Sequence, residues 1–363
     1  MRSGRVRTIG PAAGLSAAGV LAMAGLGGCS PSPSATPAHT GSATSSPAQQ
    51  SSGGPAPTAQ DDGNAPAGVG YISLLWGRSN WQVATGPGCT THYPGARTLA
   101  DNAADLAARG MSATAMVVVS RTKDSGHPCF SNYTEQASWA DLRALADTYG
   151  WSVTSQGMHY ANMTQMTTDA QRYAESAATL PILAERGYPR AWGAFAFANN
   201  KRDAPAVALV SRYFGFLRKY GGGLNTRASS TTAPYTMNTL SINGGRCHNP
   251  ALPCYLMKTA GDTRTTDRAL ITAALRPGPE RWGVVQAYRL VEGAQGRIGE
   301  GTAWDCTSAD WRDRWTSQAE IFCRNSYLEA IDTRDRAAIV TDPTTVAEAW
   351  GRSPADYLGW PRP

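Results

Sequence analysis

The side chains best suited to chemistry in this 363-residue chain lie in one short stretch, residues 151–166. A helix expected to end at Tyr149-Gly150 precedes a short β-branched strand, residues 153–155, and a polar loop follows it. A single imidazole with no carboxylate beside it cannot hold a catalytic metal ion, whereas these groups hydrogen-bond well to hydroxyls and amides. The groups are Ser155, Gln156, His159, Tyr160 and Asn162.

A second set of reactive groups follows the apolar segment 282–290. The loop there contains Trp304, Trp311 and several carboxylates, and glycoside hydrolysis uses a pair of carboxylates. One hypothesis is therefore a glycan hydrolase that uses these acids, and the alternative is a solvated loop closed by a disulfide. The carboxylates are Glu292, Glu300, Asp305 and Asp310.

The elements that position these groups alternate between strand and helix over residues 69–363. Such alternation predicts a parallel sheet in an α/β fold, and the number of repeats favours a barrel over an open sheet. Sites in a barrel form where the strands end. We expect strands at residues 71–76, 113–120, 153–155, 191–197, 282–290 and 337–340. We expect helices at residues 98–109 and 343–350, and three more whose first residues are marked by caps. One begins at Ser138 with Asp141 in its capping box, one begins at Thr167 or Thr168 and runs to about residue 186, and one follows Asp203 with Pro205 in its first turn.

With these elements in place, the chain resembles the polysaccharide deacetylases of the NodB-homology kind, in the same order along almost the whole domain. The family's first strand ends Thr-Phe-Asp-Asp-Gly, and this chain has Leu75-Trp76-Gly77 at the last three positions. The family's Ser-His-x-x-x-His-Pro-Asn-Leu is matched by Ser155, with Gln156 and Tyr160 at the histidine positions. Three further segments correspond in position. Residues 113–116 of this chain stand where the family has Ala-Thr-Phe-Phe, and Ala198-Asn199 stand where it has the Pro-Tyr of Pro-Tyr-Gly. Tyr288 stands where the family has the histidine of Leu-x-His.

This resemblance implies an irregular (β/α) barrel of the polysaccharide deacetylase or glycoside hydrolase/deacetylase type. Deacetylation in that family requires a divalent metal ion bound by two imidazoles and a carboxylate. It also requires a general base and a general acid. Leu75, Trp76, Gln156, Tyr160 and Tyr288 stand at those positions here. We therefore expect a degenerate member with no metal, no cofactor and no deacetylase activity.

The same strand ends could instead recognise sugars, with a flat ring for stacking and polar groups for hydroxyls and acetamides. An alternative stays open for several of them: Trp76 with Leu75 fills the core, His159 and Tyr160 are hydrogen-bonded loop residues, and Tyr288 packs in its strand. The candidate glycan-binding residues are Trp76, Arg78, Gln156, His159, Tyr160, Asn199 and Tyr288.

The N-terminus is typical of a bacterial lipoprotein. Three arginines precede an apolar run, residues 9–26, and Leu26-Gly27-Gly28-Cys29 is typical of a lipobox. We expect a signal peptide over residues 1–28 and lipidation of Cys29, which anchors the protein to the cell membrane on its extracytoplasmic side. An ordinary secretory signal and an uncleaved span are the alternatives. Residues 29–68, rich in Ser, Pro, Thr and Ala, predict a disordered tether.

Cysteines and charge agree with export. Apart from Cys29, the chain has an even number of cysteines, which predicts disulfides in an oxidising compartment, and no pair has zinc-finger spacing. The net charge of +6 includes the three signal arginines, so it does not indicate a nucleic-acid partner. Order along the chain favours Cys89 with Cys129, Cys247 with Cys254 and Cys306 with Cys323, but spacing alone does not fix the connectivity.

Three functions follow from the sequence. The first is a catalytically silent barrel on a lipid anchor that binds cell-wall polysaccharide or peptidoglycan, or scaffolds envelope proteins. The second is a carbohydrate hydrolase with non-standard catalytic residues. The third is a purely structural envelope lipoprotein.

Overall fold

The computed structural model describes residues 68–77, 97–122, 124, 137–220, 223–227, 236–241, 270–293, 296–298, 302–307 and 321–357. All of them belong to one compact unit, Gln60–Pro363. The signal segment, Cys29 and almost all of the tether lie outside this part of the chain, so what the sequence predicts for them stays a prediction. No helix among the described residues is long and apolar enough to cross a bilayer.

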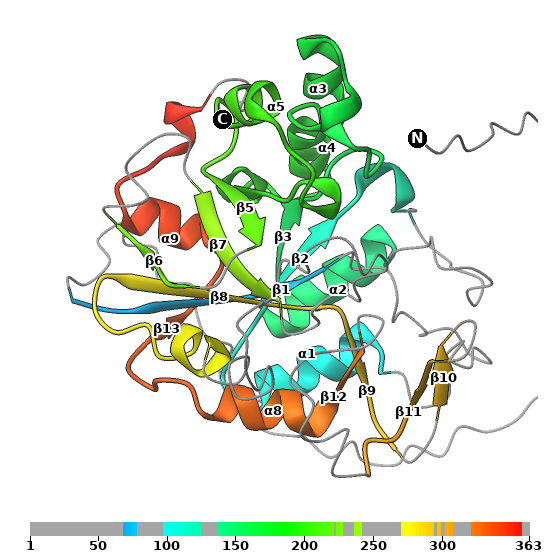
Figure 1. Cartoon of the computed structure of the whole chain (residues 1–363), viewed down its shortest axis with the longest axis vertical. Helices are drawn as coiled ribbons and strands as arrows, with labels where there is room; N and C mark the ends of the chain where they lie inside the picture. The colour runs from blue at the N-terminus through cyan, green and yellow to red at the C-terminus, as the bar shows by residue number, and fades with distance from the viewer. Residues whose placement is uncertain are drawn as a thin grey trace, which may run out of the picture. The chain divides into compact units, whose positions relative to one another are not determined.

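The centre of the fold is a closed barrel of parallel strands (Figure 1). Strand β1 pairs with β2 on one side and with β8 on the other, and this second pairing closes the sheet. The predicted α/β class and parallel (β/α) barrel are thereby confirmed. In sheet order the barrel strands are β1 (Tyr71–Trp76), β2 (Thr114–Val117), β3 (Ser152–Ser155), β4 (Ala194–Phe195), β5 (Phe216–Tyr220), β7 (Thr236–Ser241) and β8 (Arg281–Ala287).

Shorter strands extend the edges of the barrel strands. Strand β13 (Ile339–Val340) pairs with the first half of β1, and β6 (Asn225–Thr226) runs antiparallel to the start of β8. Two small pairs stand apart from the barrel sheet: β9 (Arg289–Val291) with β12 (Ile321–Cys323), and β10 (Gly296–Ile298) with β11 (Thr302–Trp304).

Helices lie outside the strands, and α1 and α8 lie side by side below β1 in the view of Figure 1. The helices are α1 (Leu99–Ala107), α2 (Trp139–Tyr149), α3 (Asp169–Glu175), α4 (Thr179–Glu185), α5 (Ala204–Val210), α8 (Arg324–Asp332) and α9 (Pro343–Ala349). Short 3-10 turns follow two barrel strands, η1 (Val119–Arg121) after β2 and η4 (Ala198–Asn200) after β4.

The helix starts follow the predicted capping chemistry. The Ser138 hydroxyl accepts a hydrogen bond from the Asp141 backbone N–H, and the Asp141 carboxylate accepts one from the Ser138 backbone N–H, which is a capping box. Thr168, one of the two expected caps, begins α3, and Asp203 caps α5 with a proline in its first turn. Short polar side chains therefore fix where the helices begin.

Several predicted boundaries were wrong. The helix expected up to about residue 186 is two helices, because the backbone leaves the helical region at Ser176 (φ −111°, ψ −80°). The strand expected at 191–197 is only β4, preceded by a 3-10 turn at Ala191–Gly193. The apolar run 282–290 is divided between β8 and β9, which pair with different partners.

Two hydrophobic clusters lie on the two faces of β1. Leu74 and Trp76 belong to the cluster with residues of α1, α2 and α8, outside the barrel. Tyr71 and Leu75 belong to the second cluster, with Trp282 of β8. Because side chains alternate along a strand, this second face is the barrel interior.

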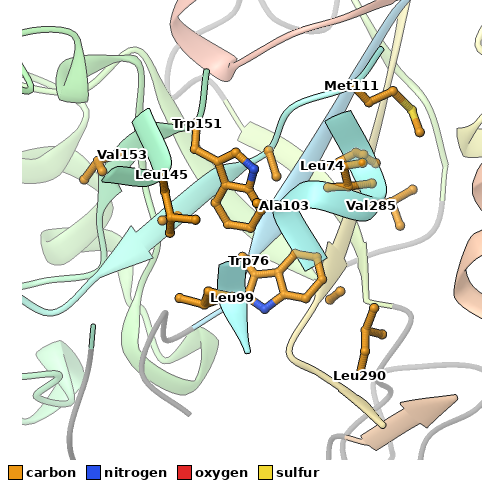
Figure 2. Close-up of a cluster of buried hydrophobic side chains, with 14 of the residues drawn as sticks. Leu74, Trp76, Leu99, Ala103, Met111, Leu145, Trp151, Val153, Val285 and Leu290 are labelled. Atoms are coloured by element: carbon orange, nitrogen blue, oxygen red, sulfur yellow. The ribbon is translucent and has the colours of Figure 1, made fainter. Parts of the chain in front are cut away.

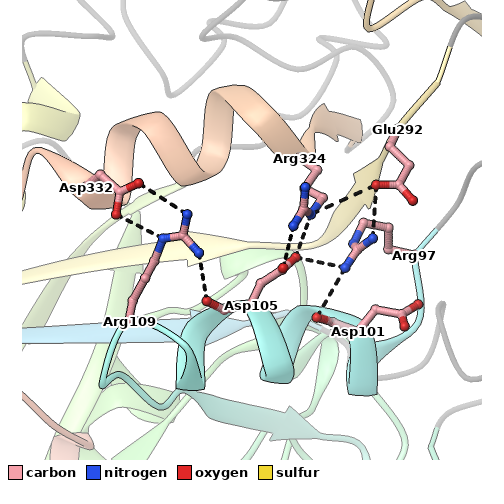
Figure 3. Close-up of polar contacts among 7 residues, drawn as sticks. All are labelled: Arg97, Asp101, Asp105, Arg109, Glu292, Arg324 and Asp332. Atoms are coloured by element: carbon pink, nitrogen blue, oxygen red, sulfur yellow. Dashed lines mark hydrogen bonds and ion pairs between the residues drawn. The ribbon is translucent and has the colours of Figure 1, made fainter.

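An ion-pair network joins α1, α8 and the end of β9 (Figure 3). The carboxylate of Asp105 is only 13% exposed and accepts from Arg97 at 2.8 Å. It also accepts two hydrogen bonds from Arg324, at 2.6 and 2.5 Å. Arg97 in turn reaches Glu292 at 2.9 Å. The network fixes α1 against the segment that begins at β12.

A disulfide lies next to this network. Cys306 and Cys323 are bonded, with their Cα atoms 5.6 Å apart, which confirms one of the predicted pairs. The other four cysteines of the prediction, Cys89, Cys129, Cys247 and Cys254, lie outside the described residues.

Candidate functional site

The loop after β3 is held by one buried carboxylate. Glu175, 3% exposed at the end of α3, accepts from the backbone N–H of Ala161 at 2.9 Å and of His159 at 3.1 Å. Gly157 passes so close that an added Cβ would lie 2.4 Å from a Glu175 carboxylate oxygen. Glu175 therefore positions the loop that carries His159 and Tyr160.

The ionisation of Glu175 makes a testable link to stability. Burial raises the pKa of its carboxyl, and the hydrogen bonds from the Ala161 and His159 amides offset this shift only in part. A carboxyl whose folded pKa is raised contributes stability at low pH and loses it as pH rises through the folded pKa. As pH rises from the unfolded pKa of Glu175 to its folded pKa, we expect the free energy of unfolding of the wild type to fall relative to that of Glu175→Gln. Urea unfolding at a series of pH values measures this difference. Parallel pH profiles for the two proteins would contradict this assignment.

Polar side chains from three successive strand ends meet beside this loop. His159 Nδ1 lies 2.9 Å from Ser120 Oγ, and Arg121 donates to the His159 carbonyl at 3.2 Å. The Arg121 guanidinium also lies over the Tyr160 ring, 5.8 Å from its centroid. The Tyr160 hydroxyl donates to Asn199 Oδ1 at 3.0 Å and accepts from the Asn199 backbone N–H at 3.2 Å.

The backbone of these loops is strained. Tyr160, Asn199 and Asn200 have φ values of 62°, 48° and 57°. Left-handed conformations disfavour residues other than glycine, and such strain tends to persist where function requires a fixed geometry. We call the set Ser120, Arg121, His159, Tyr160, Asn199, Asn200 and Arg202 the rim.

A buried polar pair lies inside the barrel below the rim. Arg218, 1% exposed on β5, donates to Gln286 Oε1 of β8 at 2.6 Å and to the Phe197 carbonyl at 3.2 Å. Because β7 separates β5 from β8 in the sheet, this contact crosses the barrel interior. Arg202 joins the pair to the rim, since its Nη1 donates to Asn200 Oδ1 at 2.9 Å and to the Arg218 carbonyl at 3.0 Å.

Trp76 is not part of the rim, and its proposed role as a stacking surface needs correction. Its ring is 1% exposed and packs against Trp151, with ring centroids 5.6 Å apart (Figure 2). It also packs against Tyr327, whose ring centroid is 5.8 Å away. As the last residue of β1, Trp76 points away from the barrel interior into the helix layer. The alternative interpretation, in which Trp76 and Leu75 fill the core, describes the structure.

Two other candidates are also buried. Gln156 is 1% exposed and Tyr288 is 9% exposed, so neither presents its side chain to solvent as predicted. The Tyr288 ring packs on the backbone of Gly77, where an added Cβ would lie 2.2 Å from a ring carbon. This close approach explains why a glycine follows β1. Arg78 lies outside the described residues.

The structure brings together the remaining three candidates, His159, Tyr160 and Asn199. Sequence patterns did not single out their partners Ser120, Arg121 and Arg202, because serine and arginine after a strand are common on any surface. The sequence did contain a signal that could have identified Arg218 as a functional candidate, because it is a charged residue directly after the apolar pair Phe216-Leu217. Glu175 gave no signal, since a glutamate at the end of a helix is ordinary.

The positions of the family's metal ligands do not fit a metal ion here. Leu75 and Trp76 offer no donor atoms, Gln156 is buried, and the Tyr160 hydroxyl is bonded to Asn199. Within the described ranges, no group of three or more His, Cys, Asp or Glu side chains is placed to hold a metal ion.

The carboxylates suggested for a glycosidase are engaged elsewhere or undescribed. Glu292 pairs with Arg97, and Asp305 accepts from the backbone N–H and hydroxyl of Thr307 at 3.0 and 2.6 Å. Glu300 and Asp310 lie outside the described residues. Nothing in their described contacts indicates a catalytic pair.

Comparisons with known proteins give similarities in structure only. No family model matches the sequence, and no curated protein matches it. The chain is similar in structure to a polysaccharide deacetylase from Bacillus cereus, at 17% identity and a TM-score of 0.26, over 31% of this chain and 32% of that one. It is also similar to a family 4 carbohydrate esterase from Streptomyces lividans in complex with acetate, at 17% identity and a TM-score of 0.28, over 43% of this chain and 64% of that one.

The chain thus spans about a third of the first of these structures and less than two thirds of the second. At such low TM-scores and identities, the barrel assignment rests on the strand order of this chain itself.

Proposed function

We propose that this chain is a membrane-anchored extracytoplasmic lipoprotein whose barrel binds cell-envelope glycan at the rim, without metal-dependent deacetylase activity. The lipid anchor would be Cys29, joined to the barrel by the tether of residues 29–68. The glycan would be cell-wall polysaccharide or peptidoglycan.

The observation that carries this proposal is a fixed hydrogen-bonding surface at three strand ends, where the sequence resemblance expects no metal ligands. His159 and Asn199 are exposed, and Tyr160 is half-buried and bonded to Asn199. Glu175 and the strained backbone hold these groups in place, so little ordering entropy is lost when a ligand binds. Amide, hydroxyl and imidazole groups of this kind suit sugar hydroxyls and acetamides.

Binding tests the proposal directly. Calorimetry with peptidoglycan fragments and N-acetylglucosamine oligomers is expected to show binding to the full chain in detergent. His159→Ala and Asn199→Gly should each weaken it about tenfold, the loss of one or two hydrogen bonds. Glycine tolerates the left-handed backbone at position 199, so the fold is retained. Arg281→Gln, at an exposed position where β8 begins, at the opposite end of the barrel, is the matched control.

Two further measurements separate the alternatives. Cys29→Ser should move the protein from the membrane to the soluble fraction. Stoichiometric zinc in the purified protein, with metal-dependent acetate release from N-acetylated oligosaccharides, would establish a deacetylase instead. Absence of binding to any glycan, with the barrel folded, would favour a purely structural lipoprotein.

A further inference from the structure

Three arginines lie at the rim or directly below it, and the exposed Lys201 lies between Asn200 and Arg202 in sequence. Arg121 ends the 3-10 turn after β2, Arg202 follows the turn after β4, and Arg218 lies on β5. The neighbouring carboxylates have other partners, and Asp124, three residues after Arg121, pairs with Arg186. Glu175 holds the His159 loop, and Asp203 caps α5 by accepting from the Ala206 N–H at 2.9 Å.

The rim arginines bond to neutral groups. Arg121 contacts the His159 carbonyl and the Tyr160 ring, and Arg202 contacts the Asn200 side chain and the Arg218 carbonyl. In the described part of the chain neither of these two arginines forms an ion pair with a carboxylate. The network around α1 differs, because each arginine there, Arg97, Arg109 and Arg324, meets a carboxylate.

The positive charges also act on each other. Burial lowers the pKa of Arg202, and the positive charge of Arg218 lowers it further. Two positive charges in a partly buried setting repel each other, and an anion bound to Arg202 from the solvent side would relieve that repulsion. Tyr160 and Asn199 lie between Arg121 and Arg202 along the rim, so hydroxyl-binding and charge-binding groups share one surface.

We propose that the rim binds an anionic glycan, whose sugars carry carboxylate or phosphate groups, with Arg121 and Arg202 as the residues that contact those groups. This inference rests on the proposed glycan-binding function and specifies its ligand class. Arg218 is a positioning residue, since it is buried and acts by presenting its carbonyl to Arg202. Guanidinium groups bind both carboxylate and phosphate oxygens well, so the chemistry admits either group.

Calorimetry with the full chain in detergent distinguishes these ligands. The probes are galacturonic acid oligomers, mannose oligomers that carry phosphate groups, and N-acetylglucosamine oligomers of matched length. We expect at least one anionic probe to bind about tenfold or more tightly than the neutral one, as charge-assisted hydrogen bonds require. Its affinity should also fall as salt increases. The anionic probe that binds identifies the group as carboxylate or phosphate.

Variants assign the effect to the two arginines. Arg121→Gln and Arg202→Gln should each weaken binding of the anionic probe about tenfold more than binding of the neutral probe. Arg121→Lys and Arg202→Lys retain the charge and should restore part of the affinity, while Arg281→Gln should behave as wild type. Urea unfolding of each variant shows that a loss of binding is not a loss of fold.

The outcomes separate this inference from the function beneath it. Equal binding of neutral and anionic probes, unaffected by the arginine variants, would overturn the anionic selectivity and leave glycan binding intact. Binding of neither class would overturn both proposals.

Discussion

Replacing Trp76 with alanine is expected to lower the free energy of unfolding by about 3 to 5 kcal/mol, the usual cost of removing a large buried aromatic ring. The ring is 1% exposed and packs against Trp151 (Figure 2). It also contacts the Tyr327 ring. Urea unfolding measures the loss. If Trp76 instead stacked on a sugar, the same change would leave stability almost intact and abolish binding.

Two matched variants sharpen this test. Trp76→Phe should cost much less than alanine, because it keeps most of the ring and removes an indole N–H that has no hydrogen-bond acceptor among the described residues. Tyr173→Ala removes an aromatic ring that is 40% exposed, so its cost should be about 1 kcal/mol or less. Similar losses for Trp76→Ala and Tyr173→Ala would refute the core assignment.

Asp105→Asn is expected to lower the free energy of unfolding by about 3 kcal/mol, because it leaves partly buried guanidinium groups without their main counter-charge. Burial alone would raise the pKa of Asp105, but the hydrogen bond from Arg324 and the charges of Arg97 and Arg324 bring it below its usual value. A carboxyl with a lowered folded pKa contributes stability above its unfolded pKa and loses it as pH falls through the folded pKa. The difference between wild type and Asp105→Asn should therefore shrink on acidification.

The same network contains the control. Asp332 pairs with Arg109 at 2.9 Å, but its side chain is 44% exposed, against 13% for Asp105. Solvent screens such a pair, so Asp332→Asn should cost about 1 kcal/mol or less. Added salt should reduce the loss of stability caused by Asp332→Asn more than the loss caused by Asp105→Asn. Equal losses from the two substitutions would show that burial of Asp105 contributes nothing.

The elements with strong local signals were predictable from sequence. Strand β1 lies at residues 71–76 as predicted, because its six residues are all suited to a buried strand. Ser138 and Asp141 marked the start of α2 through a capping box, which depends only on residues three apart. Alternation of such elements was sufficient to predict a parallel barrel.

The site was less predictable because it depends on which way side chains point. Leu75 and Trp76 are both apolar, so hydrophobicity could not show which of them faces the interior. Strands β5 and β7 contain polar residues that local patterns assign to loops, and Arg218 is explained only by its contact with Gln286, which lies two strands away in the sheet. The left-handed backbone conformation at Tyr160 could not be predicted, because the residue there is not a glycine.

The pairing of β1 with β8 sets an order for the assembly of this fold. The Trp282 indole donates to the Ser73 hydroxyl across 209 positions of sequence. The backbone hydrogen-bonding groups on one edge of β1 therefore stay unpaired until the chain through β8 has been synthesised. Contacts of such long range slow folding, and an open strand edge invites mispairing in the meantime. A chain whose β8 has not yet emerged would hold a sheet that cannot close, so this chain is expected to depend on holding factors until it is nearly complete.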